Sequence, residues 1–242
     1  MTQKALVIDL NKCVGCHACA VNCKAWNTGG EYGPLPDVNP YGKDPDGVWF
    51  NRVQTYEVGQ YPDTEIRYLP KSCMHCKDAP CVEVCPTGAS FKREEDGIVL
   101  VNYDACIGCK YCSWACPYGC REYDPLAGVM KKCTLCADRI NNESLPVNER
   151  QPACVLACPT GARSFGDIDD PQSEVSNQIK DKHGYKLLPE SQANPSNHYL
   201  PKRTNHIRVD LEDFKAKRKA KIDPDKRPKP TGLKNAEDFA SP

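Results

Sequence analysis

Residues 106–116 read CIGCKYCSWAC, and Pro117 follows directly. The cysteines in this stretch are spaced C-x2-C-x2-C-x3-C, and three more groups begin with C-x2-C and end with C-x3-C. The four groups are Cys13, Cys16, Cys19 and Cys23; Cys73, Cys76, Cys81 and Cys85; Cys106, Cys109, Cys112 and Cys116; and Cys133, Cys136, Cys154 and Cys158. Only the gap between the two halves varies, so the chain contains a fourfold repeat.

The flanks of the cysteine groups repeat as well. The sequence CPTGA occurs at 85–89 and again at 158–162, and CPYG at 116–119 is a near copy. Apolar, strand-prone runs at 6–8 and 98–101 precede the first and third groups. The repeated unit is therefore expected to be a short strand, a cysteine-rich loop and a short helix that starts near C-x3-C-P, as in ferredoxins.

The cysteine spacing predicts [4Fe–4S] clusters, because such a cube needs one external thiolate for each of its four irons. Three cysteines in a C-x2-C-x2-C loop can reach three corners of one cube, while the fourth is turned toward a neighbouring cluster. Pro86, Pro117 and Pro159 follow the fourth cysteine as this pattern requires, and Lys24 after Cys23 is the one departure. Sixteen of the seventeen cysteines are thus expected to hold four [4Fe–4S] clusters.

The pairing of the groups is predicted from their order. The second and third groups are neighbours and should exchange their last cysteines, which leaves the first and fourth groups to do the same. The expected ligand sets are Cys13, Cys16, Cys19 and Cys158 for cluster 1; Cys23, Cys133, Cys136 and Cys154 for cluster 2; Cys73, Cys76, Cys81 and Cys116 for cluster 3; and Cys85, Cys106, Cys109 and Cys112 for cluster 4. Nested in this way, the four clusters form a line along which electrons can pass.

Zinc and disulfides are the competing interpretations of so many cysteines. The fourth group alone, with seventeen residues between its halves, would suit a zinc ribbon. Three compact runs of four cysteines do not, since one short loop cannot easily place four sulfurs tetrahedrally around an ion. Disulfides are typical of small secreted chains. A zinc-stapled structural protein is kept as the alternative from a different functional class.

The fold class expected from these patterns is α+β, with two nested ferredoxin-like units, a hairpin insertion and an extended C-terminal tail. The expected division is residues 1–27 with 121–168 as the outer unit, 67–120 as the inner unit, 28–66 as the insertion and 169–242 as a docking tail. Residues 48–58 look like a strand of the insertion. Asp96-Gly97 predicts a hairpin turn after Ser90-Phe91, and residues 173–182 are expected to be helical.

The charge distribution limits the possible partners. Lys+Arg and Asp+Glu both number 32, which argues against a general nucleic-acid binder. Residues 201–242 nevertheless carry twelve basic and seven acidic residues, which favours a tail that docks on a partner. We find neither a secretory signal nor an apolar run near the roughly 18 residues of a membrane span. The expected location is cytoplasmic, with periplasmic export bound to a partner as the alternative.

Several other residues near the groups are candidates for supporting roles. Cys120, outside every group, is expected to be a small buried thiol, and His17 and His75 to pack or form hydrogen bonds. Trp26 and Trp114 are expected to shield clusters from water, with packing alone as an equal alternative. Lysines beside the loops, which would favour reduced clusters, are Lys71, Lys77, Lys110, Lys131 and Lys132. Neither a nucleophile–base set nor a phosphate-binding glycine loop stands out, so the chain is expected to perform no bond chemistry itself.

The chain resembles the iron–sulfur subunits of membrane-associated molybdopterin oxidoreductases of the dimethyl-sulfoxide-reductase type. The resemblance covers residues 4–209. It rests on VIDLNKCVGCHACAVNCKAWN (7–27), SCMHCKDAPCVEVCPTGA (72–89), CIGCKYCSWACPYG (106–119), KKCTLCADRI (131–140) and PACVLACPTGARSFGD (152–167). Nitrate-reductase relatives have tryptophan at the position of Cys109 and a [3Fe–4S] cluster there, so the cysteine implies four complete cubes.

Within this family, the chain is most similar to the iron–sulfur subunits of cytoplasmic membrane-bound sulfite dehydrogenases. This similarity rests on NPYGKDPDGVWFNRVQTYEVG (39–59) and on three further stretches. The three stretches are KYCSWACPYG (110–119), MKKCTLCADRI (130–140) and NHYLPKR (197–203). The resemblance implies two partners, a large molybdopterin catalytic subunit and an integral membrane anchor that binds quinone. Electrons would then pass from sulfite to quinone. The same relay in a polysulfide, thiosulfate, tetrathionate or dimethyl sulfoxide reductase is the alternative.

Overall fold

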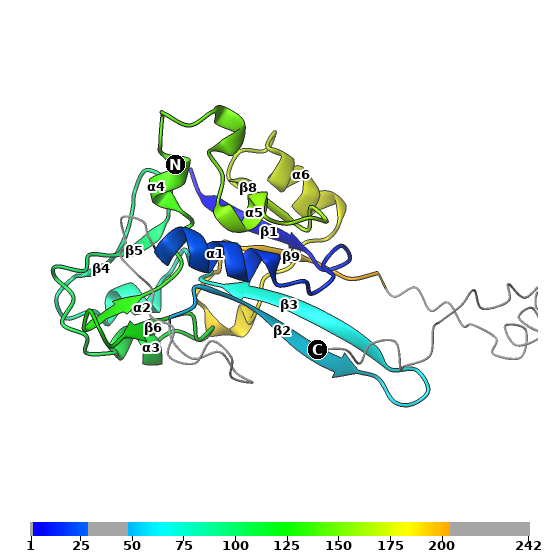
Figure 1. Cartoon of the computed structure of the whole chain (residues 1–242), viewed down its shortest axis with the longest axis horizontal. Coiled ribbons are helices and arrows are strands. Elements are labelled where there is room, and N and C mark those ends of the chain that lie inside the picture. Colours follow the sequence, from blue (N-terminus) through cyan, green and yellow to red (C-terminus); the bar gives the residue numbers. More distant parts are fainter. Residues whose placement is uncertain (1, 29–47, 204–242) are drawn as a thin grey trace, which may run out of the picture. The chain divides into compact units, whose positions relative to one another are not determined.

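A computed structural model describes residues 2–28 and 48–203 (Figure 1). Most of the Gly- and Pro-rich part of the expected insertion and nearly all of the basic tail lie outside these residues. The elements in chain order are β1 (Lys4–Asp9), α1 (Ala18–Thr28), β2 (Asn51–Val58), β3 (Glu65–Ser72), α2 (Pro80–Glu83), β4 (Ser90–Lys92), β5 (Val99–Val101), α3 (Tyr111–Trp114), β6 (Glu122–Asp124), β7 (Val129–Lys131), α4 (Ala137–Ile140), η1 (Val147–Glu149), α5 (Ala153–Leu156), β8 (Arg163–Asp167), α6 (Glu174–Asp181), η2 (Pro189–Ser191) and β9 (His198–Leu200).

The apolar run near the N-terminus forms the centre of a three-stranded sheet. Strand β1 pairs antiparallel with β8 and parallel with β9, so both of its edges are hydrogen-bonded. Its residues from Ala5 to Ile8 are at most 1% exposed, as expected for a strand that is covered on both faces. Helix α6 packs on this sheet, where Val175 contacts the apolar cluster of Val7 and Leu200. The sheet therefore joins segments that lie before the first and after the fourth cysteine group.

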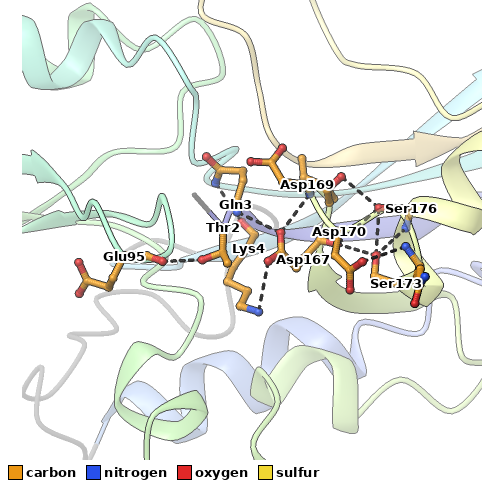
Figure 2. Close-up of polar contacts among 11 residues, drawn as sticks. Thr2, Gln3, Lys4, Glu95, Asp167, Asp169, Asp170, Ser173 and Ser176 are labelled. Atoms are coloured by element: carbon orange, nitrogen blue, oxygen red, sulfur yellow. Dashed lines mark hydrogen bonds and ion pairs between the residues drawn. The ribbon is translucent and has the colours of Figure 1, made fainter.

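Polar contacts around Asp167 fasten the end of β8 to the chain start and to α6 (Figure 2). The Asp167 carboxylate accepts a hydrogen bond from the backbone N–H of Gln3 at 3.1 Å and lies 3.9 Å from the Lys4 ammonium. Ser173 caps α6 by accepting the N–H of Ser176 at 3.2 Å. The helix predicted at 173–182 is thus confirmed, with Ser173 as its N-cap and Lys182 as its C-cap.

Three antiparallel hairpins accompany the cysteine groups, namely β2–β3, β4–β5 and β6–β7. The hairpin predicted around Asp96-Gly97 is confirmed: Ser90 pairs with Val101, and Gly97 in the turn has φ +70°. Strand β2 pairs with β3 in a register that places Asn51 opposite Ser72. Strand β3 extends beyond residue 66, where the expected insertion ends.

The prediction that a short helix starts near each C-x3-C-P is confirmed. Helices α2, α3 and α5 each begin one residue before the third cysteine of their group and end before the fourth. A proline after the fourth cysteine disfavours helical backbone at that cysteine. In the first group Lys24 stands in place of proline, and α1 continues through Cys23 to Thr28. None of the described helices is long and apolar enough to cross a membrane.

A buried ion pair closes the β6–β7 hairpin. The Asp124 carboxylate lies 2.8 Å from the Lys131 ammonium, with both side chains at most 4% exposed. The second oxygen of Asp124 accepts the backbone N–H groups of Leu126 and Ala127 at 2.9 and 3.1 Å. Burial alone would raise the pKa of Asp124, but these contacts lower it below its usual value. The carboxylate thus satisfies both the turn and the buried lysine.

Replacing Asp124 with asparagine should therefore destabilise the fold. The substitution leaves the buried Lys131 ammonium without its anion, and breaking such a pair costs about 3 kcal/mol or more. In thermal scans of the iron-loaded protein at one fixed rate, the midpoint for loss of cluster absorbance should fall. Asp104→Asn, at an exposed position, is the matched control and should leave the midpoint unchanged. Equal midpoints for both variants would contradict this role of the ion pair.

Candidate metal centres

Each cysteine group begins with the same tight loop. The residue before the second cysteine has a left-handed backbone in all four groups, at Gly15, His75, Gly108 and Leu135, with φ of 70°, 45°, 64° and 54°. At Gly108 a Cβ atom would also collide with the carbonyl oxygen of Gly128, so only glycine fits there. The loop reverses the chain between the first two cysteines, as wrapping around one cluster requires.

A second local motif follows the last cysteine of three groups. In the sequence C-P-x-G, the N–H of the glycine donates a hydrogen bond to the carbonyl oxygen of the cysteine. Proline at the second position and glycine at the fourth position are typical of a type I turn. The bonds are Gly88 to Cys85 at 3.3 Å, Gly119 to Cys116 at 3.2 Å and Gly161 to Cys158 at 3.2 Å. Beyond the turn, the N–H groups of Ser90 and Ala162 donate to the sulfurs of Cys85 and Cys158 at 3.4 and 3.2 Å. Such bonds favour the thiolate, the form that binds iron.

The inner cysteines line two cavities. One cavity is lined by Cys73, Cys76, Cys81 and Cys116, together with Cys120 and Arg121. The other is lined by Cys85, Cys106, Cys109 and Cys112, and again by Arg121. In each, one cysteine of the second or third group lies with three from the other group. Helices α2 and α3 pack together at this position.

The outer cysteines are brought together by the packing of α1 on α5. Burial raises the pKa of the Cys23 thiol well above its usual value, and the neighbouring charges of Cys133, Cys154 and Cys136 raise it further. The pKa of Cys13 is likewise raised by burial and by the charges of two neighbours, Cys19 and Cys158. The last cysteine of each outer group therefore lies among cysteines of the other group.

The donor set fits iron–sulfur clusters. Burial, followed by the charges of Cys73, Cys81 and Cys116, raises the pKa of Cys76 to about 12. Four thiolates so close together need compensating cations, and bound iron supplies them. A cube also spreads its ligands around four irons rather than one. Among residues 2–28 and 48–203, no three His, Cys, Asp or Glu side chains converge as a site for a single ion.

Two unsatisfied donors point to an acceptor that the protein itself does not supply. Nη1 of Arg121 and Nε2 of His75 are buried without a hydrogen-bond partner. Nδ1 of His75 accepts the N–H of Val99 at 3.1 Å, so Nε2 carries the proton in the neutral ring. Arg121 lines both inner cavities, and His75 lowers the pKa of Cys73, which burial alone would raise. Sulfur atoms of a bound cluster are acceptors that fit these donors.

The four sets of cysteines are adjacent in a linear order. Burial is the main cause that raises the pKa of one thiol in each neighbouring pair. The charge of a thiol from the next set raises that pKa further, so the two thiols are close together. The neighbouring pairs are Cys19 and Cys154, Cys133 and Cys73, and Cys81 and Cys112. Of all seventeen cysteines, which are free of disulfides, only Cys16 and Cys109 are exposed. These two belong to the first and last sets in the order.

The seventeenth cysteine lies beside a candidate ligand. Cys120 is half-buried rather than buried as expected. Its single S–H hydrogen has two acceptors within reach, the carbonyl oxygen of Ser72 at 3.1 Å and the sulfur of Cys116. A hydrogen bond from Cys120 is the largest factor that lowers the pKa of Cys116, to about 6. Cys120 therefore supports a neighbouring thiolate.

The expectation that Trp114 shields a cluster is wrong, because its side chain is 85% exposed. Its ring lies 6.4 Å from that of Tyr111 on the same short helix. Trp26 instead links α1 to α4, since its Nε1 donates to Asp138 at 2.8 Å and the Arg139 guanidinium lies 4.4 Å from its ring. Both tryptophans thus belong to surfaces or helix contacts.

The flanking lysines differ in environment. Lys131 and Lys132 are 3% and 1% exposed, whereas Lys77 and Lys110 are exposed and Lys71 is intermediate. Lys110 lies 4.0 Å from the centre of the Tyr123 ring. Of the two histidines, His75 forms hydrogen bonds as expected, and His17 is exposed. Of the two buried lysines, Lys131 is paired with Asp124, whereas the charge of Lys132 acts on Cys73, Cys81 and Cys133.

Two important residues were missed in the sequence. Arg121 donates to the sulfur of Cys81 at 2.9 Å, and Arg163 lies 3.7 Å from the sulfur of Cys154. Each arginine lies five residues after the last cysteine of its group, Cys116 or Cys158. The same position in the second group, five residues after Cys85, is Ser90. The shared position of the two arginines could have indicated their role in the sequence. It was missed because it lies just after C-P-x-G-A, where the similarity between the repeated flanks ends.

Comparison with known proteins identifies the type of centre. Two models described as 4Fe-4S dicluster domains match residues 12–89 and 64–168. Two clusters for each domain account for four [4Fe–4S] clusters. These matches favour iron–sulfur clusters over the zinc alternative.

Several characterised proteins are similar over most of their length. A sulfite dehydrogenase subunit of Allochromatium vinosum is 61% identical over 214 residues, which cover 88% of this chain and 89% of that protein. A putative dimethyl sulfoxide reductase iron-sulfur subunit of Halobacterium salinarum is 35% identical, with 91% and 90% covered. The iron-sulfur cluster-binding subunit of menaquinone reductase of Nitratidesulfovibrio vulgaris is also 35% identical, with 82% and 88% covered. The chain therefore belongs to the family of [4Fe–4S] electron-transfer subunits that includes these three proteins.

Proposed function

We propose that this chain relays single electrons through four [4Fe–4S] clusters in a sulfite-oxidising complex. The proposed ligands are Cys13, Cys16, Cys19 and Cys158 for cluster 1; Cys23, Cys133, Cys136 and Cys154 for cluster 2; Cys73, Cys76, Cys81 and Cys116 for cluster 3; and Cys85, Cys106, Cys109 and Cys112 for cluster 4. Each cluster, when bound, takes up and releases one electron. The protein holds these centres in order and excludes water from the middle of the line.

The distribution of exposed thiols is the observation that carries this proposal. Cys16 in the set for cluster 1 and Cys109 in the set for cluster 4 are the two exposed cysteines. The set for cluster 2 is buried throughout, and in the set for cluster 3 only Cys116 is partly accessible. Electrons can then enter and leave at the ends, while the middle clusters are shielded from side reactions.

Exposed apolar residues surround both ends, which supports docking of a protein partner at each. Close to Cys109 in the sequence, the side chains of Ile107 and Trp114 are 66% and 85% exposed. Around Cys16, Val14 and Val21 are 57% and 58% exposed. Apolar surface of this kind commonly marks interaction sites. A donor subunit at one end and an acceptor subunit at the other would complete the relay.

The names of two relatives support a proposal for the two partners. The relative at 61% identity is named as a subunit of sulfite dehydrogenase, and another is named as part of a menaquinone reductase. We propose a large molybdopterin subunit as the site of sulfite oxidation and an integral membrane, quinone-binding anchor as the electron acceptor. The chain would then lie at the membrane surface through its anchor, on the cytoplasmic side.

The experiment that tests this function uses the native complex. We expect an anaerobically purified preparation to reduce an acceptor dye when sulfite is added, and to contain a molybdopterin subunit and a membrane subunit. Reduction driven only by another sulfur compound would reject sulfite oxidation. The matching control omits sulfite and supplies thiosulfate at the same concentration.

A second function is the same relay working toward a reductase. The similarity to a putative dimethyl sulfoxide reductase subunit supports this alternative. The relay does not contact substrate in either case, so polysulfide, thiosulfate, tetrathionate and dimethyl sulfoxide are each suitable acceptors to test. The reductase function would be favoured if the complex oxidised a reduced dye with one of these compounds and did not oxidise sulfite.

We also propose the nested division of the chain into units. Residues 1–27 with 121–168 would form the outer unit and 67–120 the inner unit, with 28–66 inserted and 169–242 as an extension whose α6 and β9 pack with the sheet of the outer unit. The packing of α1 on α5 and of α2 on α3 supports this division. The pairing of β1 with β8 supports it too, since it joins the two parts of the outer unit.

A further inference from the structure

A buried cation lies at each place where one set of cysteines meets the next. The three residues are Arg163, Lys132 and Arg121, which are 4%, 1% and 5% exposed. Long cationic side chains are rarely buried without a paired anion, because removing a charge from water is costly. Three such residues within one small iron–sulfur protein therefore call for a compensating negative charge.

Arg121 lies between the sets for clusters 3 and 4. Its Nη2 donates to the sulfur of Cys81 at 2.9 Å and to the hydroxyl of Ser90 at 2.5 Å. Nη1 is buried without a partner. The side chain lines both inner cavities, and Cys112 of the next set is close enough to interact with its charge. The guanidinium thus faces two candidate clusters at once.

Arg163 occupies the equivalent place between the sets for clusters 1 and 2. Nη2 donates to the side-chain oxygen of Asn51 at 2.8 Å, and Nη1 lies 3.7 Å from the sulfur of Cys154. Cys19 of the first set and Cys23 of the second are also close enough to interact with its charge. Because Arg163 and Arg121 share one position in the repeat, the local turn places both in the same way.

Lys132 lies between the sets for clusters 2 and 3. Its ammonium donates to the carbonyl of Cys133 at 2.6 Å. The charge acts on Cys133 of one set and Cys73 of the next. Among residues 2–28 and 48–203, no carboxylate lies within ion-pair distance of Lys132, Arg121 or Arg163. Thiolates and the clusters they would hold are then the negative charges that these cations face.

We propose that Arg163, Lys132 and Arg121 set the potentials of the clusters on either side of them. A fixed positive charge between two clusters stabilises an added electron on both, so it raises both potentials together. Clusters 2 and 3 are each flanked by two of these cations and clusters 1 and 4 by one, so the potentials of the two middle clusters are raised most. This inference rests on the proposed ligand sets.

The test is a redox titration of the purified native complex, followed by paramagnetic resonance. Arg121→Gln should lower the potentials of clusters 3 and 4, and Arg163→Gln those of clusters 1 and 2. Removing a buried charge at this range should change the ratio of reduced to oxidised cluster about tenfold, or about 59 mV for one electron. Arg121→Lys and Arg163→Lys keep the charge and should recover most of each shift.

The control variant is Lys180→Gln, which removes one positive charge from the exposed face of α6. Its cluster potentials should match those of the unsubstituted protein. The inference would be overturned if both glutamine variants kept their full iron content and their cluster potentials were unchanged. It would also be overturned if the glutamine and lysine variants lost equal amounts of iron, because retaining the positive charge would then make no difference. Four separate signals in the unsubstituted protein are required by the proposed relay itself, so their absence would reject the relay instead.

Discussion

Cys158→Ala is expected to remove the signal of cluster 1 and to leave cluster 2 intact. Cys158 belongs to the fourth group in sequence, but it lies near Cys13, and the other three cysteines of its group surround Cys23. Without its fourth thiolate, cluster 1 should lose iron or disassemble, which removes about a quarter of the cluster signal. Electron transfer through the complex should be lost as well, since the first centre of the line is damaged.

Three further variants make this test specific. Cys13→Ala should lose the same signal as Cys158→Ala, whereas Cys133→Ala should lose a different one. Cys120→Ala removes the cysteine outside the four sets and should keep all four signals. If Cys158→Ala matched Cys133→Ala, each outer group would hold its own cluster, and the proposed exchange would be refuted.

Cys109→Ala is expected to convert cluster 4 into a three-iron cluster. Cys109 is exposed, whereas its partner Cys112 is buried, so the iron at this corner can leave most easily when its thiolate is removed. The remaining three thiolates still hold a [3Fe–4S] centre. Unlike an oxidised [4Fe–4S] cube, such a centre gives a paramagnetic signal in the oxidised protein.

The measurement is the resonance spectrum of the air-free, oxidised variant, with iron analysis on the same sample. About one iron per chain should be missing, and a signal absent from the unsubstituted protein should be present. Ile107→Ala, next to the same site and also exposed, is the control and should show neither change. A silent spectrum with full iron content would show that Cys109 is not a ligand.

Much of the fold could be predicted because the cysteine spacing restricts the backbone strongly. The apolar run at 6–8 and the turn at Asp96-Gly97 identified a strand and a hairpin, and the helix expected at 173–182 is present. The starts of the short helices near C-x3-C-P were predicted correctly as well. Their C-terminal ends were not predicted, because four-residue helices have too few residues for a hydrophobic period.

The candidate centres were predictable as sets of residue types, but their surroundings were not. Arginine at 121 or 163 looks like any surface cation in the sequence, because burial depends on how distant segments pack. Trp114 shows the opposite error, since a large apolar side chain was expected inside and is exposed. Side chains of these kinds take their roles from tertiary contacts that local spacing does not report.

Analysis of iron and acid-labile sulfide in the chain, purified without oxygen, tests most directly whether sixteen cysteines hold four cubes. Four [4Fe–4S] clusters require about sixteen irons and about sixteen sulfides per chain. The Cys120→Ala variant should contain the same amounts. Zinc in place of iron, or iron without matching sulfide, would contradict the presence of these clusters.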